Sequence, residues 1–301
     1  IGVPKTLLEL KTEHNYAVVE MAMRARGEIA LLTQIAQPTI GLITNVGTAH
    51  IGRLGSEEAI AEAKCELLAE MPSDSVAILN HDNQRLLDTA ARFWQGETIT
   101  YGLEGGDLQG ELRGTDILQV EGQEFPLPLP GRHNALNYLG ALAVAKVLNI
   151  DWQPLTQGLS VSLPKGRAQR YELAGDVVIL DETYNAGTES MLAALQLLAQ
   201  TPGQRHIAVL GTMKELGEQS RRLHHRVGQK VKELGLDLLL VLVDDPEAAA
   251  IATGAEGIPT ECFTNHQELV MRLKDIVQSG DRLLFKASNS VGLDRVVGEL
   301  K

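Results

Sequence analysis

The segment TNVGTAHIGRLGSEEAIAEAKCELL, Thr44–Leu68, decides how the first half of the chain folds. An apolar run leads into it, glycines space its loop, and Ser56 opens a helical pattern with acidic residues in the first turn. Serine is a favoured N-cap, and the helix dipole favours negative charge beside it. His50 is therefore expected on a loop after a strand and Lys64 on the following helix. Together they indicate a metal and phosphate site.

The composition describes a globular protein with two domains of ordinary size. With 27 basic and 39 acidic residues the net charge is −12, which argues against a general nucleic-acid binder. No apolar run approaches the ~20 residues that span a bilayer, and no signal peptide is recognisable. Two cysteines imply no disulfide framework, so a cytoplasmic protein without membrane insertion is expected. The opening IGVPKTLLEL lacks a Met and reads as the interior of a longer protein.

Short apolar runs alternate with helical patterns along the whole chain, which is typical of open parallel sheets covered by helices. Buried strands are expected at 16–21, 39–46, 75–80, 177–180, 206–210, 238–243 and 282–286. Helices are expected at 27–36, 56–71, 134–148, 189–200, 220–234, 246–253, 267–278 and 291–300. Residues 98–129 break into short pieces separated by Gly and Pro, which predicts a small antiparallel extension of the first domain.

The fold class is therefore α/β, with two open, mostly parallel sheets and flanking helices. The stretch Pro164–Gly166 is the expected boundary, giving domains 1–165 and 166–301. Open α/β sheets bind ligands outside the carboxyl ends of their strands, so polar residues at those ends are the candidates for function.

In the first domain, Glu20 ends an apolar run and could hold Mg²⁺, or it is a solvated strand-end acid. His50 is a metal ligand or an exposed loop residue. Lys64 lies between acidic residues on a predicted helix. It is a solvated side chain, or it contacts a phosphate, or it reacts with CO₂ to form a carbamate that binds metal. Asn134 and Asn137, at the start of a helix, read an adenine edge or cap the helix.

In the second domain, Arg167 and Arg170 lie next to the boundary, where a guanidinium could reach a phosphate; the alternative is a solvated linker charge. Asp181 ends a strand, where a carboxylate can hold a ribose hydroxyl. Tyr184 and Asn185 could stack on and hydrogen-bond a base, or form an ordinary turn.

The last strand is followed by Lys286, Ser288 and Ser290, which could bind an anionic substrate group or form a polar loop. Each of these signals is weak alone. Their convergence on the carboxyl ends of predicted strands in both domains favours a ligand site.

At this point the sequence resembles the Mur ligase family, over essentially its whole length. The segments that carry the resemblance are IGVPKTLL, VVEMAMRARGEIA, TNVGTAHIGRLGSEEAIAEAKCELL, LNHDNQRL, GRHNALNYLGALAVA, KGRAQRYEL, LDETYNAGTESM, LGTMKELGEQSRRLH and FKASNSVGLDRVV. The resemblance implies the latter part of a central ATPase domain in 1–165 and a Rossmann-like C-terminal domain in 166–301. It also implies a phosphate loop shortly before Ile1, because no GxxxxGK[ST] occurs in the 301 residues.

The resemblance implies an ATP- and Mg²⁺-dependent ligase of peptidoglycan synthesis, cytoplasmic and monomeric. Its substrates would be UDP-MurNAc-tripeptide and D-Ala-D-Ala, joined through an acyl phosphate. The resemblance assigns magnesium binding to Glu20, to His50 and to Lys64, the last as a carbamate. It also gives His50 and Lys64 a catalytic role. It assigns nucleotide binding to Asn134, Asn137, Arg167 or Arg170, Asp181, Tyr184 and Asn185. It assigns binding of the peptide substrate to Lys286, Ser288 and Ser290.

Two departures from the family pattern are evident. The common DDSYNANP reads DETYNAGT here, and the common KGSRS reads KASNS, which removes an Arg from the peptide-carboxylate contact. The alternatives are a different Mur or folylpolyglutamate-type amide ligase, and a non-catalytic nucleotide-binding module. Without a phosphate loop, the 301 residues alone are expected to show no ligase turnover.

Overall fold

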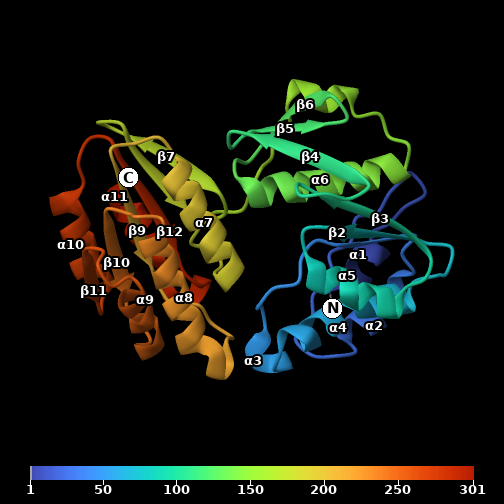
Figure 1. Ribbon diagram of the computed structural model, residues 1–301, viewed down its shortest axis with the longest axis horizontal. Helices are drawn as coiled ribbons and strands as arrows, with labels where there is room; N and C mark the ends of the chain where they lie inside the picture. Colours follow the sequence, from blue (N-terminus) through green and yellow to red (C-terminus); the bar gives the residue numbers. More distant parts are fainter. Residues whose placement is uncertain (1) are drawn as a thin grey trace. The chain divides into compact units, whose positions relative to one another are not determined.

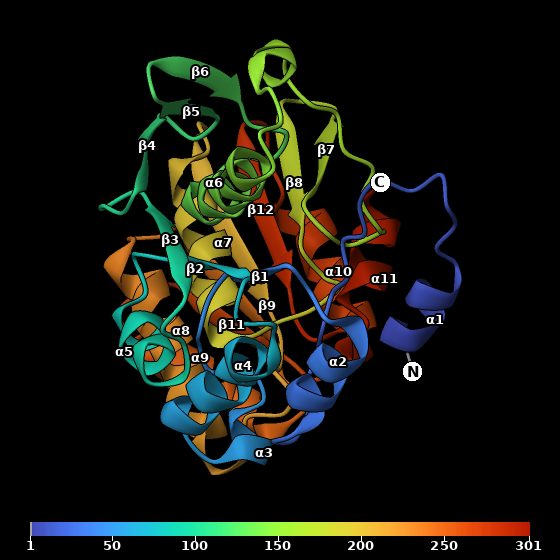
Figure 2. The same ribbon diagram turned by 90° about the vertical axis from the view of Figure 1, so that its right-hand side faces the viewer.

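The computed structural model describes residues 2–301, which divide into two compact units, one ending at Leu159 and the other beginning at Ser160. Figure 1 and Figure 2 show that each unit is a sheet with helices on both faces. The α/β class predicted from the sequence, with two mostly parallel sheets, is confirmed. None of the helices formed by residues 2–301 is long and apolar enough to cross a membrane.

The sheet of the first unit has the strand order β1-β2-β3-β4-β5-β6. Its strands are β1 (Ile40–Ile43), β2 (Val76–Asn80), β3 (Glu97–Gly102), β4 (Leu108–Arg113), β5 (Ile117–Val120) and β6 (Gln123–Pro126). Strands β1 to β4 run parallel, and β5 and β6 continue antiparallel. The predicted antiparallel extension is therefore present, but residues 97–102 belong to the parallel part.

Helices cover both faces of this sheet, with α6 on one side and α2, α4 and α5 on the other (Figure 1). The helices are α1 (Gly2–Leu8), α2 (Glu28–Ala36), α3 (Ile51–Leu54), α4 (Glu57–Glu70), α5 (Gln84–Phe93) and α6 (Arg132–Val147), and Gln153–Gln157 forms the 3₁₀ turn η1. Ser56 caps α4 as predicted, because its side chain accepts a hydrogen bond from the Ala59 amide. The core of this unit is centred on α6, where Leu139 and Leu142 pack against Tyr101 and Phe125.

The strand predicted at Tyr16–Met21 is wrong. Among residues 2–301 this segment pairs with no strand, and the side chain of Val18 is 95% exposed. An extended segment becomes a strand only when a neighbouring strand satisfies its N–H and C=O groups. The β-branched residues of this segment favour extended backbone, but this preference does not supply a neighbouring strand to pair with.

The sheet of the second unit has the order β11-β10-β9-β12-β8-β7, with only β7 antiparallel to its neighbour. Its strands are β7 (Gln169–Leu173), β8 (Val177–Asp181), β9 (Arg205–Leu210), β10 (Leu238–Leu242), β11 (Thr260–Phe263) and β12 (Asp281–Lys286). The edge strands β7 and β11 were not predicted, because both are half polar and lack the continuous apolar run of a central strand.

Five helices flank this sheet: α7 (Thr188–Gln200), α8 (Ser220–Glu233), α9 (Ala249–Gly254), α10 (His266–Ile276) and α11 (Leu293–Leu300). Short 3₁₀ turns lie at η2 (Gly217–Gln219), η3 (Pro246–Ala248) and η4 (Asn289–Val291). Helices α7, α8 and α9 cover one face, and α10 and α11 cover the other (Figure 1).

Helices α8 and α9 pack unusually closely through two facing glycines. A Cβ on Gly228 would overlap the carbonyl oxygen of Ile251, and a Cβ on Gly254 would overlap the carbonyl oxygen of His225. The two backbones therefore touch directly, and neither position has room for a side chain.

Substituting Gly228 by Ala should therefore lower the free energy of unfolding of this unit by about 3 kcal/mol, because overpacking moves backbone. Chemical denaturation measures the change. The matched control is Gly298 on α11, where an added Cβ meets nothing within 4 Å. There Ala should raise stability by roughly 0.5–1 kcal/mol, because Ala is the better helix former. Equal effects at both positions would contradict the close packing.

Candidate functional site

The loop that follows β1, residues 44–50, is held from the neighbouring helix α4. Lys64 projects from α4 and its Nζ donates a hydrogen bond to the Asn45 carbonyl oxygen at 2.8 Å. His50 ends the loop with φ of 65°, in the left-handed region, directly before α3. The structure thus brings Lys64 to the loop that carries His50, at the carboxyl end of β1, as the sequence predicted.

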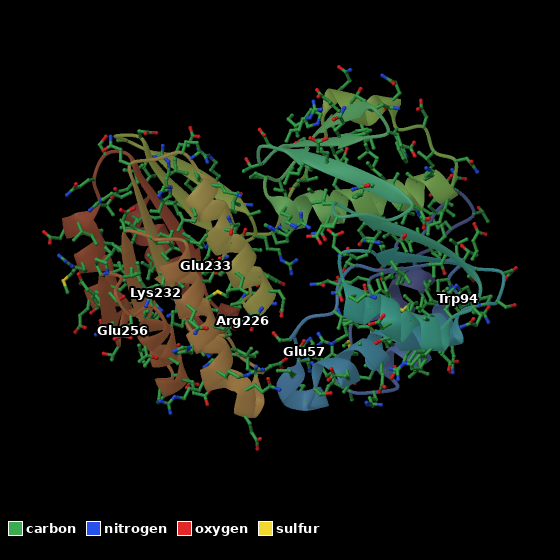
Figure 3. All side chains as sticks on the ribbon, in the orientation of Figure 1. Glu57, Trp94, Arg226, Lys232, Glu233 and Glu256 are labelled. Atoms are coloured by element: carbon green, nitrogen blue, oxygen red, sulfur yellow. The ribbon has the colours of Figure 1, made fainter. Side chains whose placement is uncertain are left out.

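The acids that flank Lys64 in sequence are directed elsewhere. Glu62 binds Arg26 at 2.8 Å and Arg92 at 3.1 Å. Glu66 accepts hydrogen bonds from the first amides of α2, at Gly27 and Ala30. These contacts hold α2, α4 and α5 together, so the carboxylates serve the packing of the helices. Figure 3 labels Glu57, in the first turn of α4, which forms an ion pair with Arg85 of α5.

Two asparagines at the end of β2 hold the same loop from the other side. Asn80 Nδ2 donates to the Thr44 carbonyl oxygen, and Asn83 Nδ2 donates to the Val46 carbonyl oxygen, both at 2.9 Å. Asn80 is buried, and Asn83 also caps α5. Neither residue was among the candidates predicted from the sequence, although their segment LNHDN carried part of the family resemblance. Its signal was a run of polar residues directly after a buried strand.

Glu20 lies exposed in an irregular segment rather than at the end of a strand. The part of the chain that the structure describes contains no group of three or more His, Cys, Asp or Glu side chains placed to hold a metal ion. The predicted magnesium ligands include only two such residues, so this finding leaves their role a prediction.

The predicted adenine contacts lie on the first turns of α6, which begins at Arg132 rather than at Asn134. Asn134 Nδ2 donates to the Pro130 carbonyl oxygen at 2.8 Å, so its amide holds the preceding turn. Asn137 is exposed one turn later. This arrangement favours the structural reading of Asn134 in the absence of ligand and leaves Asn137 accessible.

In the second unit Asp181 is buried at the carboxyl end of β8, 1% exposed. Its Oδ1 accepts from the Thr183 amide at 3.1 Å and from the Thr183 hydroxyl at 2.6 Å. Within residues 2–301 its other oxygen, Oδ2, is buried without a hydrogen-bond partner. A buried acceptor without a partner is costly, and a hydroxyl that donated a hydrogen bond to it would remove that cost.

The turn after β8 carries Tyr184, whose ring stacks under the Arg167 guanidinium with 4.0 Å between Cζ and the ring centroid. The Tyr184 amide also donates to the Gly166 carbonyl oxygen at 2.9 Å. Arg170 instead lies on β7 and pairs with Glu172 at 3.2 Å. The structure therefore brings Arg167, and not Arg170, into contact with the predicted nucleotide residues of this turn.

The three predicted substrate residues lie at the end of β12 in different settings. Lys286 is buried, and its Nζ donates to the Asn185 carbonyl oxygen at 2.9 Å. Ser288 is also buried, and its Oγ accepts from the Lys214 amide at 2.9 Å. Ser290 is exposed.

A second polar cluster lies at the ends of β9 and β10. Lys214 Nζ is 3.4 Å from the Asp244 carboxylate and 3.3 Å from the Asp245 carboxylate, and the Thr212 hydroxyl donates to Asp244. The GTMKELGE segment carried part of the family resemblance, but none of its residues was a candidate predicted from the sequence. The pattern that could have drawn attention to it is a Thr and a Lys directly after a buried strand.

A buried histidine fixes the backbone of this cluster. His224 of α8 is fully buried, its Nε2 accepts from the Met213 amide at 2.9 Å, and its Nδ1 lies 2.8 Å from the Ser220 carbonyl oxygen. These partners require a neutral ring with its proton on Nδ1. Burial lowers the pKa of His224 below its ordinary value, which favours the same neutral form.

The second unit should therefore lose stability in acid. The unfolded chain protonates this histidine near pH 6.5, whereas the folded unit resists protonation until a lower pH. As pH falls below 6.5, His224 should contribute a loss of up to about 1.4 kcal/mol per pH unit. Denaturation curves at several pH values measure this slope, and His224→Asn should reduce it. A slope unchanged by the substitution would contradict the neutral buried ring.

Both units are open α/β domains with polar groups at the carboxyl ends of parallel strands, which is where domains of this class bind ligands. The sequence matches the Mur ligase middle domain over residues 1–145 and the Mur ligase, glutamate ligase domain over residues 166–289. The chain belongs to the Mur ligase family. Among its relatives, the UDP-N-acetylmuramoyl-tripeptide–D-alanyl-D-alanine ligase of Synechocystis is 64% identical over 300 residues, covering 100% of this chain and 66% of the relative.

The ligase of the same name from Escherichia coli is 34% identical, covering 100% of this chain and 68% of the relative. The crystal structure I of MurF from Acinetobacter baumannii matches with a TM-score of 0.89 and 30% identity, over 99% of this chain and 67% of that chain. MurF ligase from Thermotoga maritima, solved in complex with ADP, matches with a TM-score of 0.81 and 30% identity, over 95% and 68%. The chain thus spans about two thirds of the length of these relatives.

Proposed function

We propose that the complete gene product joins UDP-MurNAc-tripeptide to D-Ala-D-Ala with ATP, in the cytoplasm and as a monomer. The observation that carries the proposal is the 64% identity to the Synechocystis ligase across the whole chain. In the proposed reaction the γ-phosphoryl group of ATP passes to the substrate carboxylate and ADP is released. The D-Ala-D-Ala amine then attacks the acyl phosphate, loses a proton, and phosphate departs as the amide forms.

The two halves of the chain take separate parts in this proposal. Residues 1–165 serve as the latter part of a central ATPase domain, and residues 166–301 serve as the C-terminal domain. The finding that supports this division is the match of the two Mur ligase domain descriptions to residues 1–145 and 166–289.

In the second unit we assign the nucleotide to Asp181, Tyr184, Asn185 and Arg167. The buried Asp181 Oδ2 is suited to accept a hydrogen bond from a ribose hydroxyl. The Arg167 guanidinium, which lies over one face of the Tyr184 ring, suits a phosphate, and the ring itself, 38% exposed, suits a base. In the first unit Asn134 and Asn137 would meet the adenine or ribose, and Asn134 would exchange its bond to Pro130 for one to the ligand.

Magnesium is assigned to Glu20, His50 and Lys64. The donor set fits only if Lys64 carries a carbamate, since an ammonium group donates hydrogen bonds and cannot ligate a cation. Its bond to the Asn45 carbonyl places this side chain at the loop that ends in His50, where a carbamate would add two oxygens. The bound ion would neutralise charge on the phosphoryl and carboxylate oxygens. Asn80 and Asn83 hold the backbone of that loop.

The direct test is a phosphate-release assay on the complete gene product with ATP and UDP-MurNAc-tripeptide. D-Ala-D-Ala should give one phosphate per amide bond, and single amino acids should give none. Release with glutamate or another amino acid would instead support a different Mur or folylpolyglutamate-type ligase. Nucleotide binding without release for any amine would support a non-catalytic module. The 301 residues alone, which lack a GxxxxGK[ST] segment, should not turn over.

A further inference from the structure

Lys286 at the end of β12 is buried against the turn that follows β8. Its side chain is 4% exposed, and its ammonium group lies 3.8 Å from the Glu182 carboxylate besides donating to the Asn185 carbonyl oxygen. The main chain joins the same two segments, because the Glu182 amide donates to the Phe285 carbonyl oxygen at 2.9 Å. The end of β12 and the turn 182–185 are thus connected by side chain and backbone together.

In this ion pair the charged form of each side chain is stabilised by the opposite charge of the other. Burial is the main influence on each group, lowering the pKa of Lys286 and raising the pKa of Glu182, and the opposite charge counteracts it in both cases. Removing one partner leaves the other charge buried and unpaired, which is strongly unfavourable. With its side chain only 4% exposed and its ammonium group facing Glu182 and the Asn185 carbonyl oxygen, Lys286 presents little surface to a substrate carboxylate.

The turn that Lys286 holds carries groups that we assign to the nucleotide. Tyr184 precedes Asn185 directly, is 38% exposed, and stacks under Arg167. Anchoring the Asn185 carbonyl therefore fixes the backbone between Asp181 and the Tyr184 ring. A loosened turn would misplace the stacking surface without removing any group that touches a nucleotide.

We propose that Lys286 and Glu182 are positioning residues that fix the turn 182–185 for nucleotide binding, and that Lys286 does not itself bind the peptide substrate. This inference rests on the proposed ligase function for its ATP readout. Lys286 thus has a different role from the one expected from the sequence, and Glu182 joins it although it was not a predicted site residue.

The test compares Lys286→Met, Glu182→Gln and the double variant in the complete gene product. Both single variants should raise the KM for ATP roughly 10-fold or more. Lys286→Met leaves the Glu182 carboxylate, 21% exposed, without its charged partner, and Glu182→Gln leaves the buried Lys286 ammonium without its own. The KM values for D-Ala-D-Ala and UDP-MurNAc-tripeptide should stay within about twofold of the parent. The double variant should be no worse than the worse single variant, because the two residues act as a unit. Glu182→Asp, which keeps the charge, should restore most of the ATP affinity.

The matched control is Lys274→Met, which breaks an exposed pair of similar length, 3.7 Å to Glu299, and should leave every KM unchanged. A readout that needs no activity is Trp fluorescence in a Tyr184→Trp background. Lys286→Met should shift the emission of the new Trp to the red, and Lys274→Met should not. The fluorescence result stands even if the protein proves to have no ligase activity, so the two proposals can fail separately.

A raised KM for a peptide substrate with unchanged ATP affinity would overturn the proposal and make Lys286 a direct contact. Unchanged Trp emission in the Lys286→Met variant would also overturn it. So would a Glu182→Gln variant that behaves like the parent protein.

Discussion

Asp181→Asn is expected to weaken nucleotide binding by roughly 10- to 100-fold, the scale of one hydrogen bond to a charged group. Asn can keep the two bonds from Thr183 through its Oδ1, so the turn after β8 should retain its shape. The amide nitrogen then replaces the buried Oδ2 as a donor, and a ligand hydroxyl loses its acceptor. Calorimetric titration of the complete gene product with ADP measures the change.

The same substitution should not destabilise the apo protein. It replaces a buried carboxylate, one of whose oxygens has no hydrogen-bond partner within residues 2–301, by a neutral amide of the same shape, so the melting temperature should stay constant or rise. The control is Asp275→Asn, an exposed carboxylate of α10 paired with Arg272, which should change neither property. Full ADP affinity in Asp181→Asn would refute the ribose assignment, and a fall in melting temperature would show that the carboxylate stabilises the fold.

Lys64→Arg is expected to lower kcat at least about 100-fold, the scale of losing one preorganised electrostatic group. Arg can still donate to the Asn45 carbonyl oxygen, so the loop after β1 should keep its anchor. It cannot form a carbamate, because that reaction requires a neutral amine to attack CO₂ and the guanidinium stays protonated. The substitution therefore separates the structural from the proposed catalytic part of this side chain. Steady-state kinetics over a range of Mg²⁺ concentrations provide the measurement.

Lys146→Arg on α6, which pairs with Glu121 at the surface, is the control and should retain full activity. Mass spectrometry of the native protein should show one added CO₂ that is lost in Lys64→Arg. If Lys64→Arg keeps a fifth or more of the parent kcat, the carbamate has no essential role and the residue serves the loop alone. Lys64→Met would then still lower stability, since it leaves the Asn45 carbonyl without this donor.

The sequence predicted most of the central strands, because continuous apolar runs bounded by polar residues are a local signal. It did not predict β7 and β11, whose strand character depends on the neighbour they pair with. It also placed a strand at Tyr16–Met21, where local propensity is high and a partner is missing among residues 2–301. Pairing is a property of the tertiary structure, and a single strand's residues do not encode it.

The candidate site, like the fold, was only partly predictable from the sequence. The positions of Asp181 at the end of a strand and of Lys64 on the helix after a strand and loop were predictable from the order of these elements. The hydrogen bonds that hold them come from residues distant in sequence, such as Asn83 beside the loop after β1. His224 gave no recognisable sequence signal, because a histidine inside a basic helical pattern reads as surface. Its burial and its bond to Met213 follow only from how α8 lies on the sheet.

The contact between Gly228 and Gly254 also bears on motion within the second unit. Because the two backbones touch, α8 and α9 cannot slide past each other without a collision of main-chain atoms. His224 of α8 accepts a hydrogen bond from the Met213 amide, and α9 follows the Asp244–Asp245 segment at the end of β10. The two helices are therefore expected to move together, so a displacement of α9 should also displace the backbone at Met213.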